Sequence, residues 1–254
     1  EHGAAAFLSR VQFRDAEHVD GQLNLDNVEK LILKSKVHKP IIKTVSIENT
    51  HLASGGSIVS FDSIKSLSKI VRKHDLKLHI DGARIWHAIQ EDKNMNYGHY
   101  CDSLTFCFSK ALGAPIGSML LGSEEFIREA REFRKKLGGG MRQVGVIASM
   151  ARTALQSRES ILEDHAKARK VYDCLIANLN NEKIESIVYK GTNMIFLNIK
   201  NEEDPNKLLD IFYKESINAG LIGEKSIRLV FHKDIVHTDL DKICEKLAHS
   251  SSKF

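Results

Sequence analysis

The sequence predicts an α/β fold in which helices on both faces of a mostly parallel sheet make three layers, followed by a smaller C-terminal α+β lobe. First, short β-branched runs alternate with helical patterns in the first half of the chain. Second, the run Cys101–Phe108 is apolar or aromatic at nearly every position, as expected of a strand covered on both faces. Third, the elements become shorter after about residue 180, which is typical of a separate small lobe.

The elements of the first half follow from their residue patterns. A β-branched run follows Pro40, and a short apolar run ends at Asp81. Between them, apolar residues recur every three or four positions behind Asp62, which predicts a helix with an acid in its first turn. We therefore expect strands over residues 40–48, 76–81, 101–108 and 117–121, and a helix over 62–74.

The composition changes in the second half. A highly charged helical pattern over 123–136 stops at three consecutive glycines, and a second helical pattern runs from Gln143 to about Asn180. This second pattern would carry the chain out of the first domain, so we expect a large domain over 1–155 and a small domain over 156–254. Within the small domain we expect strands over 193–199 and 226–231, and helices over 205–219 and 238–248.

Charge and cysteine content exclude several classes of protein. The 254 residues hold 37 Lys and Arg against 33 Asp and Glu, and this net charge of +4, with a single Trp, is too weak for a nucleic-acid-binding surface. No uncharged apolar run approaches the ~18 residues of a membrane-spanning helix, and the first residues lack the pattern of a signal peptide. None of the four cysteines forms a Cys-x-x-Cys pair, which suits free thiols in a reducing compartment and predicts a cytoplasmic protein.

Two polar residues follow predicted strands. Asp81 ends one buried strand, and Lys110 follows another, directly before a turn with Gly and Pro. In open α/β sheets the ligand crevice lies beyond the carboxyl ends of the strands, so both side chains should reach it. Taken singly, Asp81 could be a turn or helix-cap residue, and Lys110 could extend to solvent. Together, an amine and a carboxylate are the minimum equipment for pyridoxal phosphate, one for its carbonyl and one for its ring nitrogen.

Five stretches of the sequence match a known family in order and spacing. They are Ile47–His51, His79–Arg84, Cys107–Gly117, Leu137–Gln143 and Ile227–Asp234. With these stretches in register along nearly the whole chain, the sequence resembles the threonine aldolases of the aspartate-aminotransferase-like, or fold type I, pyridoxal-phosphate enzymes. No single stretch is diagnostic, but five in register are specific, and the resemblance implies the same fold as the residue patterns.

The resemblance implies roles at the cofactor for four residues. Lys110 would bind pyridoxal phosphate covalently, and Asp81 would pair with its pyridine nitrogen. Ser109 would contribute to the phosphate site. Arg84 would lie beside the cofactor, in reach of its ring hydroxyl or of the substrate.

Three further residues would act on the substrate or near it. The resemblance implies that Arg228 binds the substrate carboxylate, that His51 lies by the substrate hydroxyl, and that Arg142 is a weaker candidate near the active site and a subunit contact. Each has a plainer interpretation: His51 could satisfy its loop, Arg228 could be a surface charge on a strand, and the glycines before Arg142 could merely break a helix. A guanidinium matches a carboxylate with two parallel hydrogen bonds, which favours the functional role of Arg228.

The implied reaction is the cleavage of a β-hydroxy-α-amino acid, threonine or allo-threonine, to glycine and an aldehyde. The resemblance also implies a homo-oligomer, either a dimer or a tetramer. Two alternatives stay open at this point. The chain could catalyse another fold type I reaction such as β-elimination, or it could be a non-catalytic scaffold that keeps the fold for subunit association.

The family has a further N-terminal portion before the position matched by Glu1. That portion carries a Gly/Thr turn for the phosphate and a His that stacks on the pyridine ring. We therefore expect residues 1–254 alone to bind pyridoxal phosphate poorly and to cleave little substrate.

Overall fold

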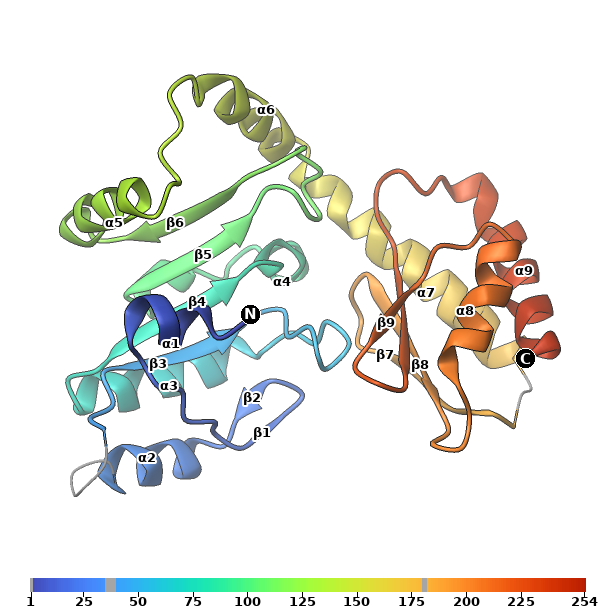
Figure 1. Cartoon of the computed structure of the whole chain (residues 1–254), viewed down its shortest axis with the longest axis horizontal. Helices are drawn as coiled ribbons and strands as arrows, with labels where there is room; N and C mark the ends of the chain where they lie inside the picture. Colours follow the sequence, from blue (N-terminus) through green and yellow to red (C-terminus); the bar gives the residue numbers. More distant parts are fainter. Residues whose placement is uncertain (1, 35–39, 180–181) are drawn as a thin grey trace.

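The computed structural model describes residues 2–34, 40–179 and 182–254. Figure 1 shows two lobes, with helix α7 (Ile161–Asn178) running from the larger lobe into the smaller one. Two positions used in the sequence analysis, Glu1 and Asn180, lie outside the described residues. The boundary between residues 155 and 156 stays a prediction.

The sheet of the large lobe contains four strands in the order β3-β4-β5-β6. They are β3 (Thr44–Glu48), β4 (Lys77–Gly82), β5 (Ser103–Cys107) and β6 (Ser118–Gly122). The first three are parallel, whereas β6 runs antiparallel to β5. Only residues 108–117 connect β5 to β6, and a parallel return needs a longer crossover, usually a helix. The sheet is thus mostly parallel, as the sequence predicts.

The two faces of this sheet differ in polarity. Helices α3 (Phe61–Lys73) and α4 (Ile85–Glu91) cover one face, where Leu78 and Ile80 are at most 1% exposed. On the other face, polar residues of neighbouring strands stand in register. The prediction that Cys101–Phe108 is covered on both faces is therefore wrong, because only its alternate residues Leu104, Phe106 and Phe108 are buried.

The remaining elements of the large lobe flank this sheet. They are α1 (Ala4–Ser9), β1 (His18–Val19), β2 (Gln22–Leu23), α2 (Leu25–Lys34), the 3₁₀ turn Tyr97–His99, α5 (Glu124–Lys136) and α6 (Gly145–Gln156). The helical pattern predicted from Gln143 is two helices, α6 and α7, with a 3₁₀ turn at Arg158–Ser160 between them. At this break the hydroxyls of Ser157 and Ser160 donate to backbone carbonyls, which competes with regular helical bonding.

The small lobe is an antiparallel sheet in the order β7-β8-β10-β9, with α7, α8 and α9 packed against it. Its other elements are β7 (Ile184–Tyr189), β8 (Met194–Ile199), α8 (Pro205–Lys214), β9 (Gly220–Ile222), β10 (Ser226–Val230), the 3₁₀ turn His237–Asp239 and α9 (Leu240–Lys253). The predicted helix 205–219 ends early because Ser216 has a left-handed backbone with a φ of 61°. The small lobe has its own hydrophobic core, which forms around Leu197, Phe212 and Ile227.

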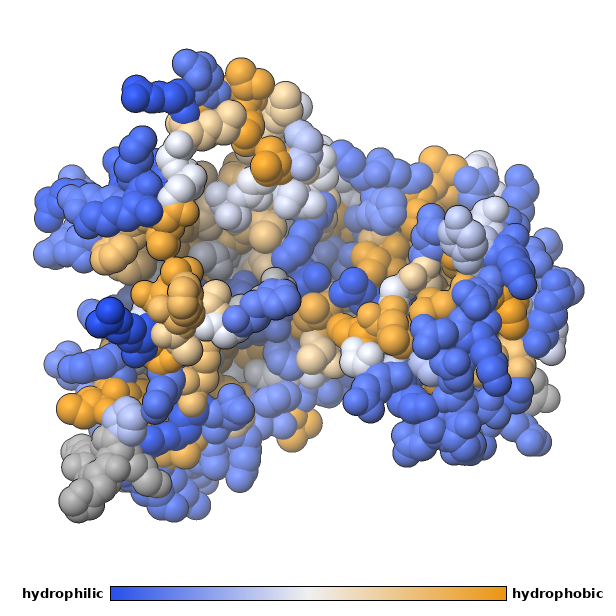
Figure 2. Space-filling view, in the orientation of Figure 1, coloured by the Kyte–Doolittle hydropathy of each residue, from blue (hydrophilic) through white to orange (hydrophobic). Residues whose placement is uncertain are grey.

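Part of the large lobe leaves apolar side chains exposed. Figure 2 shows hydrophobic residues on the surface of its upper part, where β6, α5 and α6 lie. The exposed residues in these elements include Met119, Leu121, Phe126, Phe133 and Met150. Contiguous exposed apolar surface is typical of a region that contacts other protein. Of the helices among the described residues, none combines the length and the apolar character needed to cross a bilayer.

Candidate active site

The carboxyl ends of β3 and β4 bring two carboxylates into one register. Glu48 of β3 pairs with Asp81 of β4, and Asp81 pairs with Thr105 of β5. Because these residues stand side by side, they lie on the same, polar face of the sheet. The Asp81 Oδ1 atom accepts the backbone N–H of Ala83 at 3.0 Å, which fixes the carboxylate at the strand end while the residue stays exposed.

Arg84 lies among these charges. It occupies the N-cap position of α4, its side chain is 16% exposed, and its Nη1 atom lies 3.8 Å from the Glu48 Oε1 atom. Burial lowers the pKa of the Arg84 guanidinium, and the positive charge of Arg228 lowers it further, whereas Glu48, Cys107 and Asp81 oppose this shift. The arginine therefore lies within electrostatic reach of residues from three strands of the large lobe and of one residue from the small lobe.

Arg228 comes from the small lobe, on β10. Its neighbours Ile227 and Leu229 are buried in the core of that lobe, so the alternation of the strand turns Arg228 to the opposite face. There its charge acts on Arg84 of the large lobe. Two guanidinium groups that repel each other favour an anion between or beside them, and a carboxylate is the anion that their planar geometry suits.

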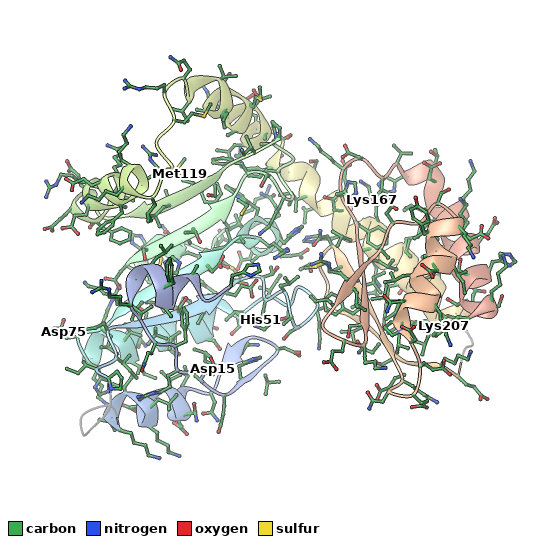
Figure 3. The ribbon with its side chains drawn as sticks, viewed as in Figure 1. Asp15, His51, Asp75, Met119, Lys167 and Lys207 are labelled. Carbon is green, nitrogen blue, oxygen red and sulfur yellow. The ribbon has the colours of Figure 1, made fainter. Side chains whose placement is uncertain are left out.

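His51 lies on the loop that follows β3, on the side of the large lobe that faces the small lobe (Figure 3). Its Nδ1 atom is 2.8 Å from the Ser54 Oγ atom, and its backbone N–H donates to the Ser57 carbonyl at 2.8 Å. Burial lowers the pKa of the His51 imidazole, and the charge of Glu48 partly opposes this. A half-buried imidazole whose lowered pKa favours the neutral form is suited to accept a proton.

Lys110 and Ser109 lie in the turn after β5, at the same end of the sheet as Asp81. The backbone N–H of Gly113 donates to the Lys110 carbonyl at 2.8 Å, and the N–H of Ala114 donates to the Phe108 carbonyl at 2.9 Å, so the turn is closed at both ends. Ser109 and Lys110 are exposed. In the part of the chain that the structure describes, no hydrogen bond or ion pair engages the Lys110 amine.

The structure thus brings together most of the residues that the sequence analysis selected. Arg84 interacts with Asp81 and Arg228, and His51 shares Glu48 with Arg84. Ser109 and Lys110 reach the same edge of the sheet through β5. Arg142 is different: it is exposed in the segment that joins α5 to α6, and within the described residues its side chain makes no hydrogen bond or ion pair.

Sequence reasoning missed two residues of this cluster, Glu48 and Cys107. Glu48 had a readable signal, because it ends a predicted strand, as Asp81 does, and the carboxyl ends of parallel strands meet at one edge; the structure pairs the two residues. Cys107 had only its place in an apolar strand. Across residues 2–34, 40–179 and 182–254, no three His, Cys, Asp or Glu side chains come together as a metal site.

Comparison with known proteins extends this description. Residues 1–200 match the beta-eliminating lyase family. The chain is 34% identical over 233 residues to the uncharacterized protein R102.4 of Caenorhabditis elegans, an alignment that covers 89% of this chain and 56% of that protein. It is also 34% identical over 270 residues to the probable low-specificity L-threonine aldolase 2 of Arabidopsis thaliana, with 98% of this chain and 73% of that protein covered.

A solved structure of similar fold is the threonine aldolase of Leishmania major. The TM-score is 0.77 at 18% sequence identity, over 94% of this chain and 70% of that one. This likeness confirms the predicted fold class, an α/β large lobe followed by a smaller lobe. The chain spans 56% and 73% of the lengths of the two sequence relatives named above.

Proposed function

The chain belongs to the beta-eliminating lyase family, as a relative of the low-specificity L-threonine aldolases, and from this premise we propose that it takes part in pyridoxal-phosphate-dependent cleavage of a β-hydroxy-α-amino acid to glycine and an aldehyde. Threonine or allo-threonine, which yields acetaldehyde, is the substrate we favour. One observation carries the proposal: Arg84, whose Nη1 atom lies 3.8 Å from the Glu48 carboxylate at the strand ends, is also acted on by the charges of Asp81 and, from the small lobe, of Arg228. This arrangement suits an amino-acid carboxylate next to a cationic ring.

The residues present offer a partner to each of the four polar groups of pyridoxal phosphate: its carbonyl, ring nitrogen, phosphate and ring hydroxyl. The Lys110 amine is exposed and unpaired among the described residues, so it is available to react with a carbonyl. One oxygen of the exposed Asp81 carboxylate accepts a backbone N–H, which leaves the other oxygen to hold a proton on a ring nitrogen. For the phosphate this chain offers the exposed Ser109 hydroxyl beside Lys110. Arg84 and Arg228 then remain for the ring oxygen and the substrate carboxylate.

Bound in this way, pyridoxal phosphate supplies an electron sink for the bond between Cα and Cβ of the amino acid. The protein residues do the rest. Arg228 holds the substrate carboxylate through its two-pronged guanidinium, and Arg84 supports it from α4. Asp81 would keep the proton on the ring nitrogen. His51, kept neutral by burial, takes the proton from the β-hydroxyl directly or through a water, and the aldehyde then leaves.

The test is a product analysis. Protein expressed together with any residues that precede Glu1 in its natural sequence is supplied with pyridoxal phosphate and with L-threonine or L-allo-threonine, and glycine and acetaldehyde are measured. Equal amounts of the two products, lost on Lys110→Ala, would support the proposal. A catalytically inert protein that nevertheless binds the cofactor would instead favour the scaffold.

The name of the matching family favours β-elimination as the second candidate. The same amine and carboxylate would serve that reaction, whereas His51 would have no β-hydroxyl to act on. Cysteine or tryptophan as substrate distinguishes the two activities. Pyruvate and ammonia would identify an eliminase, and glycine with an aldehyde would identify an aldolase.

We also propose that the protein is a cytoplasmic homo-oligomer, a dimer or a tetramer. The exposed apolar residues of β6, α5 and α6 support self-association, because such surface is normally buried in a contact. Arg142 lies in the segment between α5 and α6, so a subunit contact there would bring it toward an active site. Size-exclusion chromatography with light scattering measures the mass directly, and a monomer at high concentration would contradict the proposal.

A further inference from the structure

The turn that carries Lys110 is touched by the small lobe through one residue. The Lys233 Nζ atom donates to the Gly113 carbonyl at 3.2 Å, across 120 positions of sequence. Gly113 in turn donates its N–H to the Lys110 carbonyl. A side chain of the small lobe is therefore two hydrogen bonds away from the candidate cofactor lysine.

The contact is one of packing as well as hydrogen bonding. Gly113 has a left-handed backbone, with a φ of 74°, and a Cβ atom at this position would lie 2.4 Å from both the Lys233 Cε and Nζ atoms. The lysine side chain thus lies directly across the glycine. The left-handed backbone favours a glycine here, and its missing side chain leaves the room that Lys233 occupies.

The segment that carries Lys233 is itself fixed to the small lobe from both sides. Phe231 and Asn193 exchange two hydrogen bonds, Phe231 N–H to the Asn193 carbonyl at 2.8 Å and Asn193 Nδ2 to the Phe231 carbonyl at 3.0 Å. The buried Lys167 amine donates to the His232 carbonyl at 3.2 Å and pairs with Asp164 at 3.1 Å. Figure 3 shows Lys167 in the small lobe, on α7.

A buried ion pair such as Asp164–Lys167 contributes little net stability, because both charges lose their hydration. Their side chains are 2% and 3% exposed. The Lys167 amine also donates a hydrogen bond to the carbonyl of His232, the residue directly before Lys233. The geometry of the pair therefore fixes the path of the chain at this point. Arg228 lies on β10, five residues before Lys233 on the same segment. The segment therefore connects Arg228 of the small lobe, through Lys233, to the Lys110 turn of the large lobe.

We propose that Lys233 is a positioning residue, which holds the Lys110 turn in a fixed relation to the strand of Arg228. The proposal rests on the function proposed above, since Lys110 and Arg228 must act on one molecule at once. Lys233 does not contact the substrate. It sets the distance between the lysine that binds the cofactor and the arginine that binds the substrate carboxylate.

The first experiment needs neither cofactor nor substrate. Hydrogen–deuterium exchange is measured for the segment 108–117 in the protein without pyridoxal phosphate, for wild type, Lys233→Met and Lys233→Ala. Loss of the hydrogen bond should speed exchange of this segment about 3- to 10-fold, as expected for one net hydrogen bond. Lys233→Ala, which also removes the packing on Gly113, should exceed Lys233→Met.

Lys225→Met is the matched control. Lys225 directly precedes β10, and its amine donates to the carbonyls of Asn201 and Glu203 in the small lobe, not to the Lys110 turn. It loses the same kind of contact in the same lobe, so exchange in segment 108–117 should stay at the wild-type rate. Equal exchange of this segment in wild type and Lys233→Ala, or an equal acceleration in Lys225→Met, would overturn the proposal.

The second experiment uses the same protein as the product analysis, with any residues that precede Glu1 in its natural sequence, supplied with pyridoxal phosphate. The absorbance band of lysine-bound cofactor and the KM for threonine are followed in the same variants. Lys233→Met should weaken the band at limiting cofactor and raise KM, and Lys233→Arg, which can still reach the carbonyl, should restore both. A wild-type protein without aldolase activity would refute the proposed function and leave the exchange result readable. Changes in exchange without any change in the band or KM would refute the positioning role alone.

Discussion

A buried histidine pair between the lobes should make the protein sensitive to acid. The His87 Nδ1 atom, on α4, lies 2.8 Å from the His165 Nε2 atom on α7, and the His165 Nδ1 atom lies 2.5 Å from the Glu91 carboxylate. A carboxylate can only accept, so a neutral His165 donates to Glu91 and accepts from His87. Burial, then the charges of His165 and Arg84, lower the pKa of His87 to about 3.

The direction and size of this acid sensitivity follow from the difference in bound protons between the folded and unfolded states. The folded state holds His87 neutral, whereas the unfolded chain protonates this histidine below its ordinary pKa of about 6.5. The contribution of His87 to the free energy of unfolding is therefore fully present above about pH 6.5. It is lost progressively as the pH falls from about 6.5 to about 3. Each pH unit over which the unfolded chain binds one more proton lowers the free energy of unfolding by about 1.36 kcal/mol. Between about pH 7.5 and about pH 5 the free energy of unfolding should therefore fall by roughly 2 kcal/mol.

The assay compares wild type with His87→Asn by urea unfolding, without cofactor, at about pH 7.5 and about pH 5. Asparagine keeps a donor near the position of the ring Nδ1 and cannot titrate. Any packing loss in the variant is the same at both pH values, so the wild type should lose roughly 2 kcal/mol more than the variant on acidification. His237→Asn, at an exposed site, serves as the control and should follow wild type. Parallel losses in wild type and His87→Asn would refute the reasoning.

Four substitutions test the candidate active site. Lys110→Ala should abolish covalent cofactor binding, and borohydride reduction of the loaded wild type should label Lys110; a label on another lysine would contradict the assignment. Asp81→Asn should keep the fold but lower kcat by ~10²–10³, since a neutral amide cannot hold the ring proton, and near-normal turnover in a folded variant would argue against it. Arg228→Lys should raise the KM for the amino acid about 10-fold or more through loss of a paired hydrogen bond, whereas a loss confined to cofactor affinity would place Arg228 at the cofactor. Burial lowers the pKa of His51, so the decrease of kcat/KM on acidification should be centred below the ordinary histidine pKa of about 6.5. This decrease should disappear in His51→Asn; if it stays unchanged, another group is responsible for it.

Much of the fold could be predicted from local patterns. The strands near residues 44–48, 77–82, 103–107 and 118–122 were predicted from β-branched and apolar runs, and α3 from its 3–4 spacing. Strand β7 was missed because a register shift between Ile184 and Ser186 interrupts its alternation, and two of its first three residues are exposed. The direction of β6 was not readable, since the residues of a strand do not encode the direction of its neighbour.

The candidate site was predictable where it depends on strand ends. Asp81 and Lys110 each follow an apolar run, and the carboxyl ends of neighbouring parallel strands meet at one edge. The effect of the Arg228 charge on Arg84 was not predictable from pattern alone, because it depends on how two separately folded cores pack together. Arg142 shows the opposite limit: its motif matches the family, yet within the described chain no partner holds its side chain.

The contacts between the lobes fall on the segments that carry the candidate residues. The loop of His51 is held where the buried Thr192 hydroxyl donates to the Gly56 carbonyl at 2.9 Å. The helix that starts at Arg84 is held through His87 and His165, and the Lys110 turn is held through Lys233. Each of these large-lobe segments is therefore positioned partly by the lobe that supplies Arg228. A substitution that loosens any one contact should disturb the separation between cofactor and carboxylate groups before it lowers global stability, because each contact is local while both cores stay intact.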